Sequence, residues 1–117
     1  MKTGLEFSRK VDTAYMALCK PLCKKWHLTQ TALDILMFLA NNPEFTTARD
    51  IVEIRKLKAN LVSVNVDRLV REGYLVRQEV AEDRRKTKLL CTSKADEIIT
   101  QGRKLQQDFV ALLFAGI

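Results

Sequence analysis

The chain has 117 residues, which is the size of one domain and long enough for a modest hydrophobic core. Hydrophobic residues make up 47% and charged residues 29%, an ordinary balance for a globular protein. No apolar run approaches the ~20 residues that a membrane helix needs. The basic N-terminus MKTGLEFSRK is not followed by the apolar core of a signal peptide. We therefore expect a cytoplasmic protein with no membrane partner.

The formal net charge of +6 is unevenly distributed along the chain. Residues 1–28 and 49–92 each carry a net charge of +4, whereas residues 29–48 carry −2 and residues 93–117 are neutral. Such clustering favours a polyanion such as nucleic acid, although a solvated basic surface would explain the charge equally well. The three cysteines Cys19, Cys23 and Cys91 form no paired framework and fit a reducing compartment.

Two helices are predicted in the first third of the chain. The first spans residues 5–25, and Pro21 inside it should kink or split it. Its apolar stripe consists of Val11, Tyr15, Leu18, Leu22 and Trp26. The second helix starts at Thr29 or Thr31 and ends at Asn41-Asn42-Pro43.

A helix, a turn and a second helix follow. Thr47 is expected to be the N-cap of a short helix that runs to about Ile54, and residues 55–57 make the turn. The next helix begins near Lys58 and ends at Gly73, which has the position of a C-cap glycine. Its apolar stripe contains Val62, Val66, Leu69 and Val70.

The rest of the chain predicts a hairpin and a last helix. The hairpin spans about residues 75–92, with a charged tip at residues 82–86 and a return strand at residues 88–91. The last helix starts at Ser93, where Ser93-x-x-Asp96 is similar to a capping box. Its end, residues 109–114, is densely apolar and would be an aggregation liability if exposed on a monomer.

A short helix with a polar face, followed directly by a hairpin with an arginine tip, suits DNA. The residues N-L-V-S-x-x-V-D-R-L-V-R-E-G-Y-L, then D-R-R-K-x-x-L-L-C-T, resemble the MarR family of bacterial winged helix-turn-helix transcription regulators. The match extends upstream through residues 28–36 and 47–52 and covers about three quarters of the chain in the expected order.

The resemblance implies a mainly α fold with a small β-wing (α+β), a winged helix-turn-helix with N- and C-terminal dimerisation helices. Residues 1–117 would form a single domain. Residues 28–92 would be its DNA-binding lobe, and residues 1–27 and 93–117 its helical dimerisation region. Typical family members continue into one further helix after the last one seen here.

Three residues of the predicted recognition helix, Lys58, Asn60 and Ser63, lie opposite its apolar stripe and near its N-terminus. The N-terminal residues of such a helix usually reach base edges. Asn pairs bidentately with adenine, and Ser pairs with several bases. Ser63 also matches the family's DNA-contacting Ser/Thr position. For Val64 and Asn65, a small change in docking angle decides whether they face the groove.

Asp83-Arg84-Arg85 matches the Asp-x-Arg motif of the family's wing. The resemblance implies that Arg85 enters the minor groove and that Asp83 holds an arginine in place, which agrees with the attraction of a narrow groove for guanidinium. Arg84, Lys86 and Lys88 would follow the phosphates. The alternative is a hairpin tip whose charges only keep it soluble.

Two further DNA candidates lie before the recognition helix. Thr47 could bind a phosphate through its hydroxyl and the adjacent amides, or act only as an N-cap. Arg55 and Lys56 occupy the turn in which many family members carry Gly, and they add positive charge near the DNA backbone.

Cys19, Cys23 and His27 share one face of a straight helix, which suggests a metal or a redox sensor. Pro21 should rotate the two ends apart, no fourth ligand is evident, and free Cys is usually a small buried hydrophobe. We therefore expect no metal and no cofactor. There is also no Gly-rich phosphate loop, no His–acid pair and no nucleophile elbow, so we expect no enzymatic activity.

The sequence thus predicts a sequence-specific transcription regulator, a repressor that binds double-stranded DNA at a pseudo-palindromic operator as a homodimer. The apolar stripe of the first helix and Phe109, Leu112 and Leu113 of the last helix are the expected dimer surfaces. The resemblance also implies a small-molecule effector in a cleft between the helical region and the DNA-binding lobe, with Tyr15, Cys19 and Trp26 as lining candidates. The alternatives are a thiol-responsive regulator that uses Cys19 and Cys23, and a winged-helix module that binds a protein.

Overall fold

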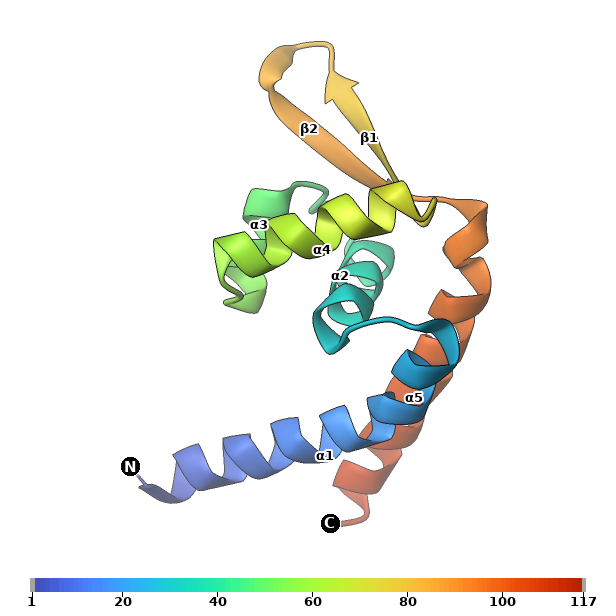
Figure 1. Cartoon of the computed structure of the whole chain (residues 1–117). Helices are drawn as coiled ribbons and strands as arrows, with labels where there is room; N and C mark the ends of the chain where they lie inside the picture. The colour runs from blue at the N-terminus through green and yellow to red at the C-terminus, as the bar shows by residue number, and fades with distance from the viewer. Residues whose placement is uncertain (1, 117) are drawn as a thin grey trace.

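The computed structural model describes residues 2–116, and it describes no side chain for residues 2–5 or for Arg84. The described residues form five α-helices and a two-stranded hairpin, so the fold is mainly α with a small β-wing, as predicted (Figure 1). The elements are α1 (Lys2–Trp26), α2 (Gln30–Asn41), α3 (Ala48–Arg55), α4 (Ala59–Arg71), β1 (Leu75–Val80), β2 (Asp83–Cys91), a 3-10 turn at Ser93–Ala95 and α5 (Asp96–Phe114).

Helix α2 forms the centre of the molecule and packs against α1, α4, α5 and β2. It is apolar around most of its circumference, as expected for a helix buried on all sides. Its buried residues are Ala32, Leu33, Ile35, Leu36, Met37, Phe38 and Leu39. The hairpin projects from one end of the molecule, and α1 and α5 lie side by side at the opposite end (Figure 1). Within residues 2–116, no helix combines the length and the apolar character that crossing a bilayer requires.

Helix α1 runs without interruption through Pro21, so of the two predicted outcomes, a kink or a split, the split is wrong. Pro21 cannot donate a hydrogen bond to the carbonyl of Ala17, one turn earlier. Both Ala17 and Pro21 are exposed, so this carbonyl can be hydrated and the helix can continue.

Threonine side chains define where α2 and α3 begin. The Thr29 hydroxyl accepts a hydrogen bond from the amide of Ala32 at 2.9 Å, which identifies Thr29 and not Thr31 as the start of α2. The Thr47 hydroxyl accepts from the amide of Asp50 at 3.1 Å, and the Asp50 carboxylate accepts from the amide of Thr47 at 3.2 Å. This reciprocal capping box confirms Thr47 as the N-cap of α3.

Helix α4 ends as the glycine predicted. Gly73 adopts the left-handed conformation (φ 86°), its amide donates to the carbonyl of Val70, and the amide of Tyr74 donates to the carbonyl of Leu69. This pair of bonds is a Schellman motif, which turns the chain sharply into β1. The wing therefore leaves the recognition helix at a fixed angle.

The wing differs in detail from the predicted hairpin. Its strands pair in regular antiparallel register from Leu75 opposite Cys91 to Glu79 opposite Thr87, and the next pair is Val80 opposite Asp83. Residues 84–86 thus bulge out of β2 without partners on β1, and the turn proper is only Ala81-Glu82. The basic residues predicted at the tip lie on this bulge.

The predicted capping box at Ser93 is wrong. Ser93 begins a 3-10 turn, and no side chain caps the start of this turn or of α5. The neighbouring Thr92 hydroxyl instead donates to the carbonyl of Gly73 at 2.6 Å, and the Thr92 amide donates to the carbonyl of Tyr74. These bonds join the two ends of the hairpin at its base.

Candidate nucleic-acid interface

The apolar stripe of α4 is buried as predicted, and this orients the opposite face of the helix outward. Val62, Val66 and Leu69 are each at most 3% exposed, and they pack into the core with α2 and α3. The exposed residues of the first three turns of α4 are Ala59, Asn60, Leu61, Ser63, Val64 and Asp67. This set includes the predicted Asn60 and Ser63, and the predicted Lys58 is the exposed N-cap residue of the same helix.

Asn65 and Val64, which the sequence left open, differ in their exposure. Val64 is 65% exposed and belongs to the outward face. Asn65 is only 4% exposed, and its carboxamide oxygen accepts from the Thr29 hydroxyl at 2.6 Å. Asn65 therefore faces the α1–α2 junction, away from any ligand bound on the outward face.

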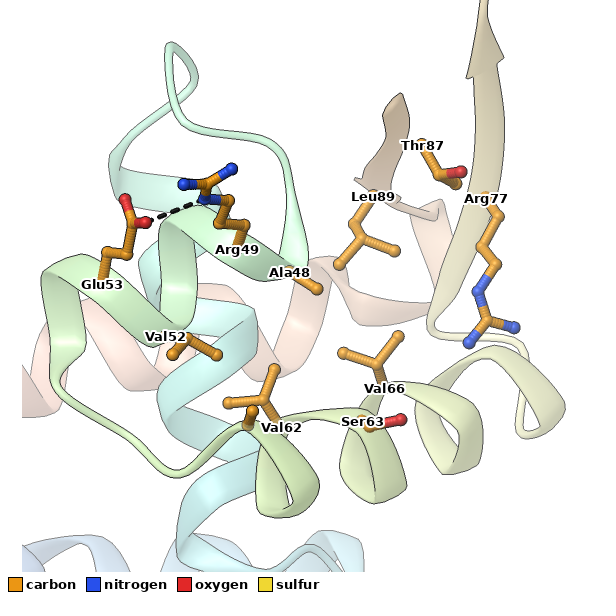
Figure 2. Close-up of a pocket in the computed structure, with 11 residues that line it drawn as sticks. Ala48, Arg49, Val52, Glu53, Val62, Ser63, Val66, Arg77, Thr87 and Leu89 are labelled. Atoms are coloured by element: carbon orange, nitrogen blue, oxygen red, sulfur yellow. Dashed lines mark hydrogen bonds and ion pairs between the residues drawn. The ribbon is translucent and has the colours of Figure 1, made fainter. Parts of the chain in front are cut away.

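A hollow of about 430 Å³ separates α3, α4 and the wing on the outward side (Figure 2). Its floor consists of the apolar residues Val52, Val62, Val66 and Leu89, and Ser63 and Thr87 contribute hydroxyls. Arg77 of β1 points from the wing toward α4 across this hollow (Figure 2). The hollow between α4 and the wing thus has an apolar floor and polar side chains at its rim, and these polar side chains could bind a polar ligand.

Two arginines that the sequence analysis missed border the same hollow. The Arg77 guanidinium forms an ion pair with Asp67 of α4, and Arg49 of α3 forms one with Glu53 at 2.8 Å (Figure 2). The i, i+4 spacing of Arg49 and Glu53 could have predicted their pair from sequence. The Arg77–Asp67 contact depends on how the hairpin folds over α4, and no local spacing reveals it.

Behind this hollow, a second groove of about 570 Å³ runs between the start of α3 and the bulge of the wing. Thr47 and Arg49 line its helical side, and Arg85, Lys86 and Thr87 line its wing side. The structure thus brings the predicted residues Thr47, Arg85 and Lys86 together on one surface. The side chain of Arg84, also predicted, lies outside the described residues.

Asp83 supports the wing through the backbone. Its carboxylate accepts a hydrogen bond from the amide of Arg85 at 2.9 Å, which fixes the turn that starts the bulge. This bond is to the main chain of Arg85, and the role of Asp83 in holding an arginine side chain stays a prediction. The Arg85 side chain is exposed at the end of the molecule that carries the wing.

The acids that line the two hollows, and Asp67 beside them, are engaged locally. Glu53 and Asp67 pair with arginines, Asp50 completes the α3 capping box, and Asp83 binds the wing backbone. Each carboxylate therefore orders a helix start, a bulge or an arginine. Their negative charge is partly compensated where a polyanion would approach.

Arg55 faces a different part of the molecule from the other predicted residues. Its guanidinium lies 3.7 Å from the carboxylate of Asp34 in α2, at a cleft of about 270 Å³ that is bordered by α1, α2 and α5. Burial raises the pKa of Asp34, and the nearby Arg55 charge opposes that rise. Arg55 is therefore separated from the groove that contains Thr47 and Arg85.

The three candidates for an effector cleft do not all line one cleft. Tyr15 lines the cleft beside Asp34 and packs edge-on against Phe109, with ring centroids 5.2 Å apart. Cys19 is fully buried in the core, and Trp26 donates its indole N–H to Gln101 of α5 at 3.2 Å. Only Tyr15 among the three borders this cleft.

The thiols lie in surroundings that disfavour the reactive thiolate. Burial raises the pKa of Cys19 and of Cys23. His27, which the helical pattern placed in line with them, follows the end of α1 in a left-handed conformation (φ 55°) and is exposed. Among the described residues, no three His, Cys, Asp or Glu side chains are grouped for a metal ion.

The fold and this surface define a winged helix-turn-helix protein: two helices joined by a tight turn, with a basic hairpin beside the second one. A profile of the MarR family matches residues 27–86, which is just over half of the chain and includes α2, α3, α4 and most of the wing. The protein therefore belongs to the MarR family of winged-helix regulators.

Solved structures of this family have the same fold. The transcriptional regulator PA3341 is 25% identical, with a TM-score of 0.83 over 98% of this chain and 83% of that one. A MarR transcriptional regulator from Methanosarcina mazei Go1 is 16% identical, with a TM-score of 0.82 over 100% of this chain and 84% of that one. S. aureus MepR, solved as a DNA complex, is 15% identical, with a TM-score of 0.70 over 93% and 82% of the two chains. No curated protein sequence matches the chain.

Proposed function

We propose that this protein is a sequence-specific DNA-binding transcription regulator that acts as a homodimer on a pseudo-palindromic operator. The observation that carries the proposal is the outward face of α4, which presents Asn60, Ser63 and Val64 next to a basic wing. This face has the size and polarity that a helix needs to enter a major groove. In support, a family member with the same fold, MepR, has been solved as a DNA complex.

In the proposed complex, different side chains have different tasks. Asn60 and Ser63 bond base edges, and the exposed apolar side chains of Leu61 and Val64 suit the methyl groups of thymine. Arg85 enters the minor groove next to the recognition helix. Lys58, Lys86, Thr47 and Arg49 follow the phosphates, and Arg84 is proposed for the same role from its sequence position alone. Arg55 has no part in this set, because it faces the α2 cleft.

Dimerisation is proposed through α1 and α5, but not through all the residues that the sequence suggested. Leu22 and Phe109 are each 8% exposed, because they are buried within one chain. The large apolar side chains that remain exposed on these two helices are Phe7, Met16, Val110, Leu112 and Phe114. A two-fold pairing of this surface would place two α4 helices on the same side of a duplex, as two operator half-sites require.

Regulation by a small molecule is also proposed, at the cleft beside Tyr15. The cleft lies between the helical region and the start of the DNA-binding lobe, and it contains the long Arg55–Asp34 contact of 3.7 Å. An anionic effector could pair with Arg55 and thereby alter how α3 sits on α2. We further propose that DNA binding represses transcription and occurs in the cytoplasm.

The wing provides the direct test. Replacement of Arg85 by Ala should weaken binding to a specific duplex by about 1–3 kcal/mol, because it removes one base or groove contact. The far-ultraviolet circular dichroism and the melting temperature should barely change, since the side chain is exposed. Affinity can be measured by fluorescence anisotropy with a duplex enriched from a random library by the parent protein.

A matched control is Lys104→Ala, which removes one exposed positive charge from α5, outside the proposed DNA surface. Its DNA affinity should equal that of the parent protein. If Arg85→Ala bound the duplex as tightly as the parent does, the wing would have no role in DNA recognition. The interpretation as a protein-binding module would then be favoured.

A further inference from the structure

The recognition helix α4 carries one buried polar side chain that faces away from the proposed DNA surface. Asn65 is 4% exposed, about as buried as Val62 and Val66, and apolar residues would be expected at such a position. A buried carboxamide destabilises a core unless each of its polar groups finds a partner. Its presence at the centre of α4 therefore calls for a physical explanation.

Asn65 belongs to a chain of hydrogen bonds that joins α4 to the start of α2. The amide of Ala32 donates to the Thr29 hydroxyl at 2.9 Å, and that hydroxyl donates to the Asn65 carboxamide oxygen at 2.6 Å. The Asn65 amide nitrogen then donates to the carbonyl of Leu61, one turn earlier in α4, at 2.8 Å. The chain begins at a helix cap and ends in the turn that carries Asn60 and Ser63.

A second bond joins the same two regions one turn later in α4. The guanidinium of Arg68 donates to the backbone carbonyl of His27 at 2.7 Å, and it also pairs with Glu72 at 3.2 Å, which restricts its rotation. His27 is held in the left-handed conformation at the end of α1, and this conformation sets the direction of its carbonyl. Asn65 and Arg68, three residues apart, thus contact the α1–α2 junction from one side of α4.

Apolar packing alone would not fix α4 to the accuracy that base recognition needs. The contacts of Val62, Val66 and Leu69 are non-directional, so the helix could slide or rotate slightly at little cost. Hydrogen bonds weaken steeply with distance and angle, so two of them on one side of the helix restrict both motions. Base-edge contacts require this accuracy, whereas contacts with phosphates depend mainly on charge.

We propose that Asn65 and Arg68 are positioning residues for DNA sequence discrimination, which hold α4 in register against the end of α1 through Thr29 and His27. This inference rests on the proposed function, and it concerns the specificity of the same DNA site. If the inference holds, the α1–α2 junction contributes to DNA sequence recognition although it does not contact the DNA.

The test compares specific and non-specific binding in variants of the full chain. The variants are Asn65→Leu, which keeps the volume of the side chain but removes both hydrogen bonds, and Arg68→Gln, which removes the bond to His27. The control is Arg71→Gln, which removes the same charge from an exposed position on the same helix. The probes are a duplex enriched by the parent protein from a random library and a scrambled duplex of the same composition, used well below the melting temperature of each variant.

We expect the ratio of specific to scrambled affinity to fall about tenfold in Asn65→Leu and about threefold in Arg68→Gln, since one or two oriented bonds are lost. Affinity for the scrambled duplex should stay the same in Asn65→Leu, and Arg71→Gln should retain the parent ratio. Unchanged ratios in both variants would overturn the proposal, even if both proteins melted earlier, because the bonds would then serve stability alone. If Asn65→Leu does not fold, the Arg68→Gln ratio decides in the same way.

A failure of the underlying function would look different. The parent protein would then enrich no duplex from the library, and both the DNA-binding proposal and this inference would fall. A parent that discriminates strongly, together with variants that discriminate equally well, would overturn only the positioning role.

Discussion

The outward face of α4 and the end of α5 both expose apolar side chains, and the surroundings of these side chains differ. On α4, Leu61 and Val64 are exposed among polar groups, with Asn60 and Ser63 on the same face and arginines across the hollow. At the end of α5, Leu112 and Phe114 are exposed in a stretch with no charged residue after Asp108. The isolated apolar side chains of α4, which are surrounded by polar groups, suit a DNA groove. The continuous apolar surface at the end of α5 suits contact with another protein surface. The same residue types therefore indicate different partners.

The largest expected effect comes from placing charge on the α5 surface. Leu112→Asp together with Phe114→Asp should convert a dimer into a monomer, because four apolar side chains per dimer would lose burial worth ~1.5–3 kcal/mol each. Specific DNA binding should be lost in parallel, since the two half-sites need two α4 helices. Light scattering at micromolar concentration measures the first effect and anisotropy the second.

The matched change on the other surface is Val64→Asp. It should weaken DNA binding without altering the mass measured by light scattering, because α4 lies apart from the proposed dimer surface (Figure 1). A monomeric parent protein would refute the assignment of the α5 surface to self-association. A monomeric Val64→Asp variant would show that the two surfaces do not act independently.

The second largest effect concerns the packing beneath α4. Leu69 is fully buried, so Leu69→Ala should destabilise the fold by about 2–5 kcal/mol through lost burial and the resulting cavity. Phe114→Ala, by contrast, removes a side chain that is 90% exposed, and the stability of the single chain should change little. Urea unfolding of both variants at low protein concentration checks this difference. Equal losses would mean that the end of α5 also contributes to the folded core of one chain.

Local sequence patterns predicted the elements of this fold well, because each depends on near neighbours. The stripe of α4, the Gly73 stop and the Thr47 cap depend on contacts within a few residues, and each is found in the structure. The mainly α fold with a β-wing and the family were likewise predicted from sequence and are confirmed. The caps at Thr31 and Ser93 were ambiguous or wrong, because several hydroxyls near a helix start compete and tertiary contacts decide between them.

The arrangement of the candidate site was harder to predict, since its contacts join distant segments. Arg55 was predicted in the turn before α4, but it is the last residue of α3 and faces Asp34 of α2, because the orientation of α3 is set by packing. Arg77 contacts Asp67 only because the hairpin folds over α4, and its position within a predicted strand does not reveal this contact. Asn65 could not be assigned from helical spacing alone, because it lies at the edge between the buried and outward faces.

A smaller effect is expected on the stability of the helical region at alkaline pH, and it depends on Tyr15. Burial raises the pKa of Tyr15 from 10.0 to about 12, with the hydrogen bond from Gln106 acting in the opposite direction. The unfolded chain would ionise this phenol first, so its contribution to stability is complete below pH 10.0 and is lost as the pH rises toward about 12. In Tyr15→Phe, the part of the alkaline loss of stability that comes from this residue should disappear.

Phenolate absorbance during an alkaline titration measures this effect directly. Tyr15→Phe should remove the late step of the titration, whereas Tyr74→Phe should retain it. If the late step persisted in Tyr15→Phe, the contact between α1 and α5 at Tyr15 would be more hydrated than its packing against Phe109 indicates. Folding has to be followed in parallel by circular dichroism, because the step is informative only while the chain is folded.

The smallest expected effect lies in the DNA-binding lobe, at the turn between α3 and α4. Lys56 adopts the left-handed conformation (φ 56°), which a residue with a Cβ atom occupies at a cost that glycine does not have. Lys56→Gly should therefore stabilise the fold slightly, by up to about 1 kcal/mol, because the relief of strain exceeds the added entropy of the unfolded chain.

The variant should nevertheless bind DNA more weakly and with a lower salt dependence, since Lys56 adds an exposed positive charge next to the recognition helix. Lys56→Arg retains both the strain and the charge, so its stability and affinity should match those of the parent. A Lys56→Gly protein that is more stable and binds DNA equally tightly would show that the charge at this turn does not contact the duplex.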